Sequence, residues 1–148
     1  MRISDVPASR TRSVHVVMCT EYRQRMRILA GGLGLGAVLF GIVPALFPGW
    51  FAHVFGIGSA DNPTVATAIR SVGIRDVVVG LGLVYAAHAG ERGALRRWVL
   101  ARAACDAGDA VAVGVALAAG TRSPRFIGLG AAAAGAALCG VAVLRAAR

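Results

Sequence analysis

The sequence predicts an all-α protein, a bundle of four transmembrane helices with both termini in the cytoplasm. First, 57% of its 148 residues are hydrophobic, which is too apolar for a soluble domain of this size. Second, four stretches are long enough to cross a bilayer: about 28–47, 63–88, 98–119 and 126–144. Third, all sixteen basic residues are Arg, and eleven of them fall in the segments that this topology places in the cytoplasm. Residues 28–148 therefore form one transmembrane domain in a multi-pass protein of the cell membrane.

Residues 1–27 are polar and rich in Arg, and we expect them to form a flexible cytoplasmic arm. The net charge of +9 is explained by insertion topology, so nucleic acid is not expected as a partner. An alternative role for the arm is binding of anionic lipid headgroups through Arg23, Arg25 and Arg27, beside the first span.

The first two spans are separated by a segment with an interfacial composition. Residues 49–58 include Trp50, Phe51 and Phe55, and aromatic side chains favour the headgroup level of a membrane. The sequence Asp61-Asn62-Pro63 then predicts a helix start, with a side-chain cap followed by proline at the first helical position. A short polar turn at residues 90–93 makes the second and third spans antiparallel neighbours.

Small residues predict close contacts between the helices. Gly32 and Gly36 form a G-x-x-x-G on the first span, which allows another helix to approach closely. The full set of glycines expected at helix contacts is Gly32, Gly36, Gly73, Gly80, Gly108 and Gly135.

The most informative stretch is charged and lies inside the second span. It contributes Arg70, Arg75 and Asp76, and the third span contributes Arg102, Asp106 and Asp109. A turn near residue 91 places Arg75 level with Asp109 and Asp76 level with Asp106. Arg75 and Asp76 are 100° apart around their helix, so we expect only one of them to point directly at the third span. Each such charge costs about 2.5–3.5 kcal/mol on insertion, so partners are required.

The number of charges leaves two outcomes open for this cluster. Three Arg and three Asp can neutralise one another, with Arg75–Asp109 and Arg102–Asp106 as structural pairs. Without Arg70, which lies near the outer interface and can reach the headgroups, one carboxylate is in excess and can carry a proton. Asp106 and Asp109 compete for that role.

No metal or cofactor is expected. His53 and His88 lack a second ligand at helical spacing, and Cys19, Cys105 and Cys139 are far apart in the sequence.

The stretch Arg70-Ser-Val-Gly-Ile-Arg75-Asp76-Val-Val-Val-Gly80, with Asp109 on the following span, resembles a domain-of-unknown-function family of small four-helix integral membrane proteins. The marker of that family is G-x-R-D-x-x-x-G on the second helix, and Gly73, Arg75, Asp76 and Gly80 match it. The resemblance runs from about Ile28 to Leu144 and implies a membrane bundle without an assigned activity.

Three functions follow as hypotheses. The first is a non-enzymatic bundle that binds a lipid or small amphiphile, or supports a membrane partner protein, through its Arg/Asp cluster. The second is a small proton-coupled transporter that works as a homo-oligomer. The third, which we favour least, is a membrane enzyme that uses the Asp106/Asp109 pair, since two carboxylates on one helix face can hold Mg²⁺.

Overall fold

The computed structural model describes the backbone of residues 8–58 and 61–146, and the side chains of residues 24–58 and 61–145. Within these residues the chain forms five helices. They are α1 (Ala8–Leu46), α2 (Pro48–Phe55), α3 (Pro63–Ala89), α4 (Arg92–Ala118) and α5 (Pro124–Ala146). The predicted all-α class is thus confirmed, with the short helix α2 as an addition.

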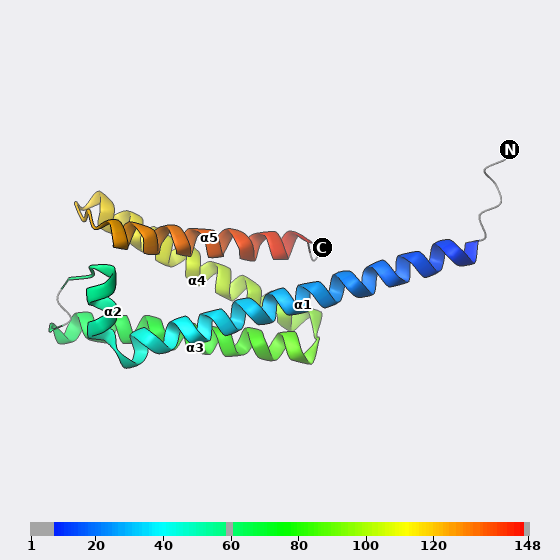
Figure 1. Cartoon of the computed structure of the whole chain (residues 1–148), viewed down its shortest axis with the longest axis horizontal. Helices are drawn as coiled ribbons and strands as arrows, with labels where there is room; N and C mark the ends of the chain where they lie inside the picture. The colour runs from blue at the N-terminus through cyan, green and yellow to red at the C-terminus, as the bar shows by residue number, and fades with distance from the viewer. Residues whose placement is uncertain (1–7, 59–60, 147–148) are drawn as a thin grey trace.

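Four of the helices run along a common axis, and the chain reverses direction from each to the next (Figure 1). The start of α1, the α3–α4 turn and the end of α5 lie toward one end of the bundle. At the other end lie α2 and the α4–α5 turn. An even number of lengthwise passes therefore brings the start of α1 and the end of α5 to the same end.

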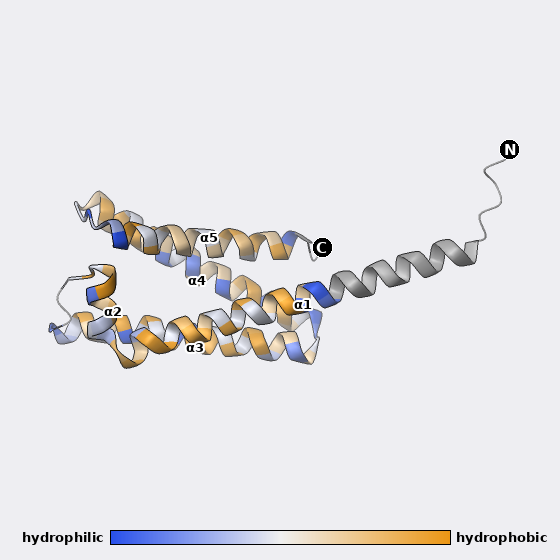
Figure 2. Ribbon diagram, in the orientation of Figure 1, coloured by the Kyte–Doolittle hydropathy of each residue, from blue (hydrophilic) through white to orange (hydrophobic). Residues whose placement is uncertain are grey.

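Three helices are long and apolar enough to cross a membrane: Gln24–Leu46 within α1, Pro63–Ala89, and Pro124–Arg145 within α5. The fourth, α4, has 27 residues but is more polar. Every 18-residue stretch within α4 contains Arg102, Asp106 and Asp109. Figure 2 shows these hydrophilic positions interrupting the apolar ribbon of α4.

The first helix begins earlier than the sequence analysis expected. Ala8 lies within the segment that was predicted to be an arm, and the helix continues without a break to Leu46. The reason is local, because residues 8–27 contain neither Gly nor Pro, so the helix can extend backward from the apolar span. Residues 1–7 of the predicted arm lie outside the described residues.

Arg27, at the end of the predicted arm, instead lies within α1 and binds the end of α3. Its Nε donates to the carbonyl oxygen of Ala87 at 3.0 Å, and its Nη2 donates to that of His88 at 2.9 Å. These carbonyls belong to the last turn of α3, which ends at Gly90 in the left-handed conformation. A cation at this position satisfies open carbonyl groups and the negative end of the helix dipole.

The start of α3 agrees with the sequence prediction. Asn62 caps it, since its Oδ1 accepts a hydrogen bond from the backbone N–H of Thr64 at 2.9 Å, and Pro63 is the first helical residue. The next helix, α4, starts at Arg92 and not at about Trp98 as predicted. The early start follows from the tight turn, in which only Gly90 and Glu91 separate the two helices.

Two pairs of glycines bring α1 and α3 into backbone contact. A Cβ added to Gly34 would lie 2.8 Å from the carbonyl oxygen of Gly80, and one added to Gly41 would lie 2.6 Å from that of Gly73. Gly34 and Gly41 are seven residues apart on α1, and Gly73 and Gly80 are seven residues apart on α3, so the two glycines of each helix share one face. The α1–α3 pair is therefore closely packed along its length.

A second pair, α4 and α5, packs through larger side chains on α4 against glycines on α5. Added Cβ atoms at Gly130 and Gly140 would meet Val113 and Ala103 at 2.5 and 2.8 Å. Most helix contacts fall within these two pairs, α1 with α3 and α4 with α5, whereas α3 and α4 touch much less.

The glycine predictions need correction at four positions. Gly73 and Gly80 lie in the α1–α3 contact, but Gly32, Gly36, Gly108 and Gly135 have no neighbouring atom within 4 Å of an added Cβ. On α1 the contact uses Gly34 and Gly41 instead. A G-x-x-x-G pattern in the sequence does not show which face of the helix meets its neighbour.

Candidate ligand-binding cavity

Two bidentate ion pairs organise the charged residues of α3 and α4: one joins the two helices, and the other lies within α4. Arg75 of α3 donates from Nη1 and Nη2 to the two carboxylate oxygens of Asp109 on α4, at 2.9 and 2.6 Å. Arg102 donates from Nε and Nη2 to the two oxygens of Asp106, one turn further along α4. These are the pairs that the sequence analysis proposed, and both use the geometry in which Arg binds carboxylate best.

Asp76 lies between the two pairs and links them. Its Oδ1 accepts hydrogen bonds from Nε and Nη2 of Arg75, at 3.3 and 3.0 Å. The same oxygen lies 3.3 Å from Nη1 of Arg102, an ion pair without hydrogen-bond geometry. The order Asp109–Arg75–Asp76–Arg102–Asp106 forms one continuous network, which we call the ion-pair network.

The sequence analysis expected only one of Arg75 and Asp76 to point directly at α4. Both side chains form ion pairs with α4, Arg75 with Asp109 and Asp76 with Arg102. Asp76 lies on the same stripe of α3 as Gly73 and Gly80, and a Cβ at Gly41 would lie 2.9 Å from its Cβ. Asp76 is therefore at the junction of α1, α3 and α4.

The network holds three carboxylates and two guanidinium groups, so it carries one carboxylate in excess. Arg70 does not balance it, because its side chain is exposed and forms no ion pair among the residues described. The geometry points to Asp76 as the excess carboxylate and not to Asp106 or Asp109, which each have a guanidinium bound to both oxygens. Asp76 is 2% exposed, and within the described part of the chain its Oδ2 accepts no hydrogen bond.

A cavity of about 920 Å³ opens beside this network. Asp76, Arg102, Asp106 and Asp109 contribute to its wall, and the rest of the lining is mostly apolar and comes from all five helices and the loop after α2. The cavity lies where the α1–α3 and α4–α5 pairs meet only sparsely. Its size is at the upper end of the range of sites that enclose a drug-sized molecule.

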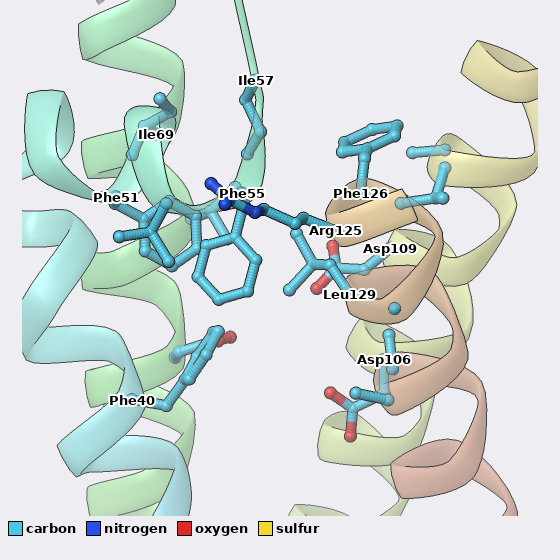
Figure 3. Close-up of a pocket in the computed structure, with 18 of the residues that line it drawn as sticks. Phe40, Phe51, Phe55, Ile57, Ile69, Asp106, Asp109, Arg125, Phe126 and Leu129 are labelled. Carbon is cyan, nitrogen blue, oxygen red and sulfur yellow. The ribbon is translucent and has the colours of Figure 1, made fainter. Parts of the chain in front are cut away.

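Aromatic rings form one wall of the cavity, and acidic residues lie across from them (Figure 3). The rings of Phe51 and Phe55 have centroids 4.6 Å apart, and Phe40 meets Phe51 edge to face at 5.7 Å. Arg125, from the first turn of α5, lies between the two walls at one end. The cavity thus combines a large apolar surface with acidic and basic side chains in its wall.

The aromatic wall was not identified from the sequence as part of a site. Phe51 and Phe55 are four residues apart, which in a helix puts them on one face, and this spacing was the available signal. The sequence analysis instead treated the segment only as an interfacial connection. Pro48 at the start of α2 and Gly56 after it bound a short helix that turns these rings toward α3 and α5.

A smaller cavity of about 270 Å³ lies on the other side of the Arg102–Asp106 pair. Its wall includes Gly32 and Gly36, so these two glycines face open space within the bundle. Four residues line both cavities: Phe40, Arg102, Asp106 and Ala136. The ion pair and the Phe40 ring therefore separate the two spaces.

Comparison with known protein families matches residues 34–144, about three quarters of the chain, to the Domain of unknown function (DUF4267). The chain belongs to this family. No protein with a curated description matches, and neither does any solved structure.

The DUF4267 domain contains every residue of the ion-pair network and every residue that lines the larger cavity. It begins at Gly34, the first glycine of the α1–α3 contact, and leaves out the first part of α1 with Arg27. The resemblance to a family of unknown function, expected from the sequence, is thus confirmed. In this chain the G-x-R-D-x-x-x-G stretch has two structural roles: Gly73 and Gly80 pack against α1, and Arg75 and Asp76 join α4.

Proposed function

We propose that this DUF4267 protein is an integral membrane protein of four spans that binds a lipid or small amphiphile in the larger cavity. Both termini lie in the cytoplasm, as the distribution of Arg favours. The protein performs no chemistry on its ligand, and the ion-pair network is the polar end of the site.

Membrane residence for α4, the third of the four proposed spans in chain order, is supported by the partners of its charged residues. Arg102, Asp106 and Asp109 all engage in the ion-pair network, so none of them has to face lipid alone. The opposite face of α4 exposes Leu100, Val111 and Val115, each more than half accessible, as expected for a lipid-facing surface. An antiparallel position between α3 and α5 also gives α4 the same depth as two helices that are apolar enough to span.

The observation that carries the proposal is the composition of the larger cavity. An amphiphile needs an apolar surface for its chain and a polar group for its head, and this cavity offers both within about 920 Å³. Phe40, Phe51 and Phe55 supply the apolar wall, whereas Asp76 and Arg102 supply polar contacts. A purely structural ion-pair network would not require an open space of this size beside it.

The test is identification of what copurifies with the protein. Native mass spectrometry from lipid nanodiscs should show a retained lipid or amphiphile on the wild type. Ala133→Phe, which fills the cavity, should remove this ligand. Ala131→Phe, two residues earlier on a different face of α5 and outside both cavities, should not. Bare protein in all three samples, or equal retention in both variants, would contradict the proposal, and a retained protein would instead indicate a membrane partner.

A second candidate function is a proton-coupled transporter that works as a homo-oligomer. The specific observation in its favour is that cavities lie on both sides of the Arg102–Asp106 pair. A carboxylate in excess could alternate between a proton and a substrate, and rearrangement of the pair would connect the two spaces. In proteoliposomes, proton flux should fall in Asp76→Asn. Unchanged flux in Asp76→Asn, Asp106→Asn and Asp109→Asn would exclude this function.

The enzyme hypothesis receives the least support. Both oxygens of Asp106 and both oxygens of Asp109 accept hydrogen bonds from Arg, so this pair is engaged in ion pairs and is not open to a metal ion. Among the described residues, no three His, Cys, Asp or Glu side chains come together as candidate metal ligands.

A further inference from the structure

We infer that the cavity selects amphiphiles with a positively charged ammonium head, and that Asp76 is the residue that recognises it. This inference rests on the proposed function, because it names the class of ligand for the same cavity. The sequence analysis left the sign of the head undefined.

The first step of the inference is the charge of the network. Arg75 and Arg102 each bind both oxygens of one carboxylate, Asp109 and Asp106, and these two pairs are formally neutral. Asp76 remains as one negative charge that is almost completely removed from solvent. A buried charge without full compensation is costly, so a cation that reaches it gains more free energy than it would in water.

The second step is the availability of a carboxylate oxygen. All contacts to Asp76 fall on Oδ1, and within the described residues Oδ2 has no donor. Asp76 is also part of the cavity wall. An ammonium group carries N–H donors, so it can satisfy Oδ2 by a charge-assisted hydrogen bond, whereas a sulfate or carboxylate head would meet like charge.

The third step is the wall near Asp76. Gly41 packs against the Asp76 side chain, and its neighbour Phe40 lines the cavity together with Phe51 and Phe55. The faces of aromatic rings attract cations, and their surface also accepts an alkyl chain. Arg125, the other cation in the wall beside Arg102, lies between the aromatic and acidic walls and forms no ion pair with Asp76 among the described residues.

The same chemistry could come from a free alkylamine or from the ethanolamine headgroup of a bilayer lipid. The cavity volume is that of a site for one drug-sized molecule, so a single alkyl chain is a suitable probe. A dodecyl series of amine, alcohol and sulfate keeps the chain constant and changes only the charge of the head.

The experiment measures binding of these three probes to the full-length protein in phosphatidylglycerol nanodiscs, by the shift in its thermal unfolding midpoint. Dodecylamine should bind with an apparent affinity about tenfold higher than dodecanol, as expected for one charge-assisted contact, and dodecyl sulfate should bind weakest. Asp76→Asn keeps the shape and the Oδ1 acceptor, and it should lower dodecylamine binding to the level of dodecanol measured in the same variant. If phosphatidylethanolamine in the nanodisc reduces the midpoint shift that dodecylamine causes, the ligand is the headgroup of a bilayer lipid. If the shift is unchanged, the ligand is a free amine.

The outcomes separate the two proposals. Equal binding of amine and alcohol by the wild type, or an unchanged preference in Asp76→Asn, overturns the inference but leaves amphiphile binding intact. Failure of all three probes to bind overturns the proposed function itself. If Asp76→Asn does not fold, Ala133→Phe serves in its place, because it leaves every charge unchanged and should remove the amine response, whereas Ala131→Phe should keep it. A response that persists in Ala133→Phe places the amine outside the cavity and overturns the inference.

Discussion

Gly41 of α1 and Gly73 of α3 lie so close that a Cβ on either residue would be 2.6 Å from the carbonyl oxygen of the other. Backbone contact of this kind is a source of stability in membranes, where apolar side chains gain little from leaving lipid. The contact also holds Asp76, three residues after Gly73 on the same face, at a fixed depth against α1.

We therefore expect Gly41→Ala to destabilise the protein by about 1–3 kcal/mol, the usual cost of overpacking, because backbone atoms cannot move aside. Gly36→Ala is the matched control on the same helix, since nothing lies within 4 Å of its added methyl group. It should be neutral or slightly stabilising, as Ala is the better helix former. Thermal unfolding in detergent measures both, and equal midpoints for the two variants would show that the α1–α3 contact is looser than described.

The second prediction concerns the Arg102–Asp106 pair. Arg102→Met should destabilise the protein by about 3–5 kcal/mol, because Asp106 and Asp76 both lose a partner while remaining buried. Adding Asp106→Leu to Arg102→Met should recover part of this loss, since one of the two carboxylates that lost Arg102 is then gone, while Asp76 keeps Arg75 as a partner. The double-mutant cycle is measured by unfolding in detergent. Additive effects of the two substitutions would mean that the pair contributes little coupling.

A third prediction tests the contact between the start of the first span and the end of α3. Arg27→Ala removes two hydrogen bonds to the carbonyls of Ala87 and His88, and we expect a loss of about 1 kcal/mol with faster hydrogen exchange in the last turn of α3. Arg25→Ala is the control, because Arg25 is exposed on the same helix. If both variants exchange alike, the cap is not formed in solution.

The fourth prediction tests whether α4 crosses the membrane. In a background where Cys19, Cys105 and Cys139 are replaced by Ser, a cysteine at Thr121 should react with an impermeant maleimide in intact cells. A cysteine at Glu91, in the α3–α4 turn at the other end of the bundle, should react only after permeabilisation. Labelling of both positions only in permeabilised cells would show that α4 stays on the cytoplasmic side.

The sequence was sufficient for features that depend on local chemistry or on simple helix geometry. The cap at Asn62 followed from an Asn before a Pro, and the depth match of Arg75 with Asp109 followed from a short turn near residue 91. Both depend on positions that are close along the chain or related by one hairpin. Features of this kind need no knowledge of how distant elements pack.

Other features depended on side-chain reach and on which helix faces meet. The sequence could not show that Arg75 and Asp76 would both form ion pairs with α4, nor that Gly34 and Gly41 would replace Gly32 and Gly36 in the contact. The larger cavity depends on five helices at once, and a cavity is a space that no residue pattern encodes directly. For these reasons Asp76 could not be recognised as the excess carboxylate.

The uneven distribution of contacts between the helices bears on how the protein is made. During synthesis α1 and α3 emerge before α4 and α5. Their glycine contact involves no later residue, so these two helices can insert and pack without the rest of the chain. It then presents Arg75 and Asp76 to a polar helix that is still leaving the ribosome. Under the proposed four-span topology, α3 would act as the template for insertion of α4, and a defect at Arg75 or Asp76 should appear first as misinserted newly made protein.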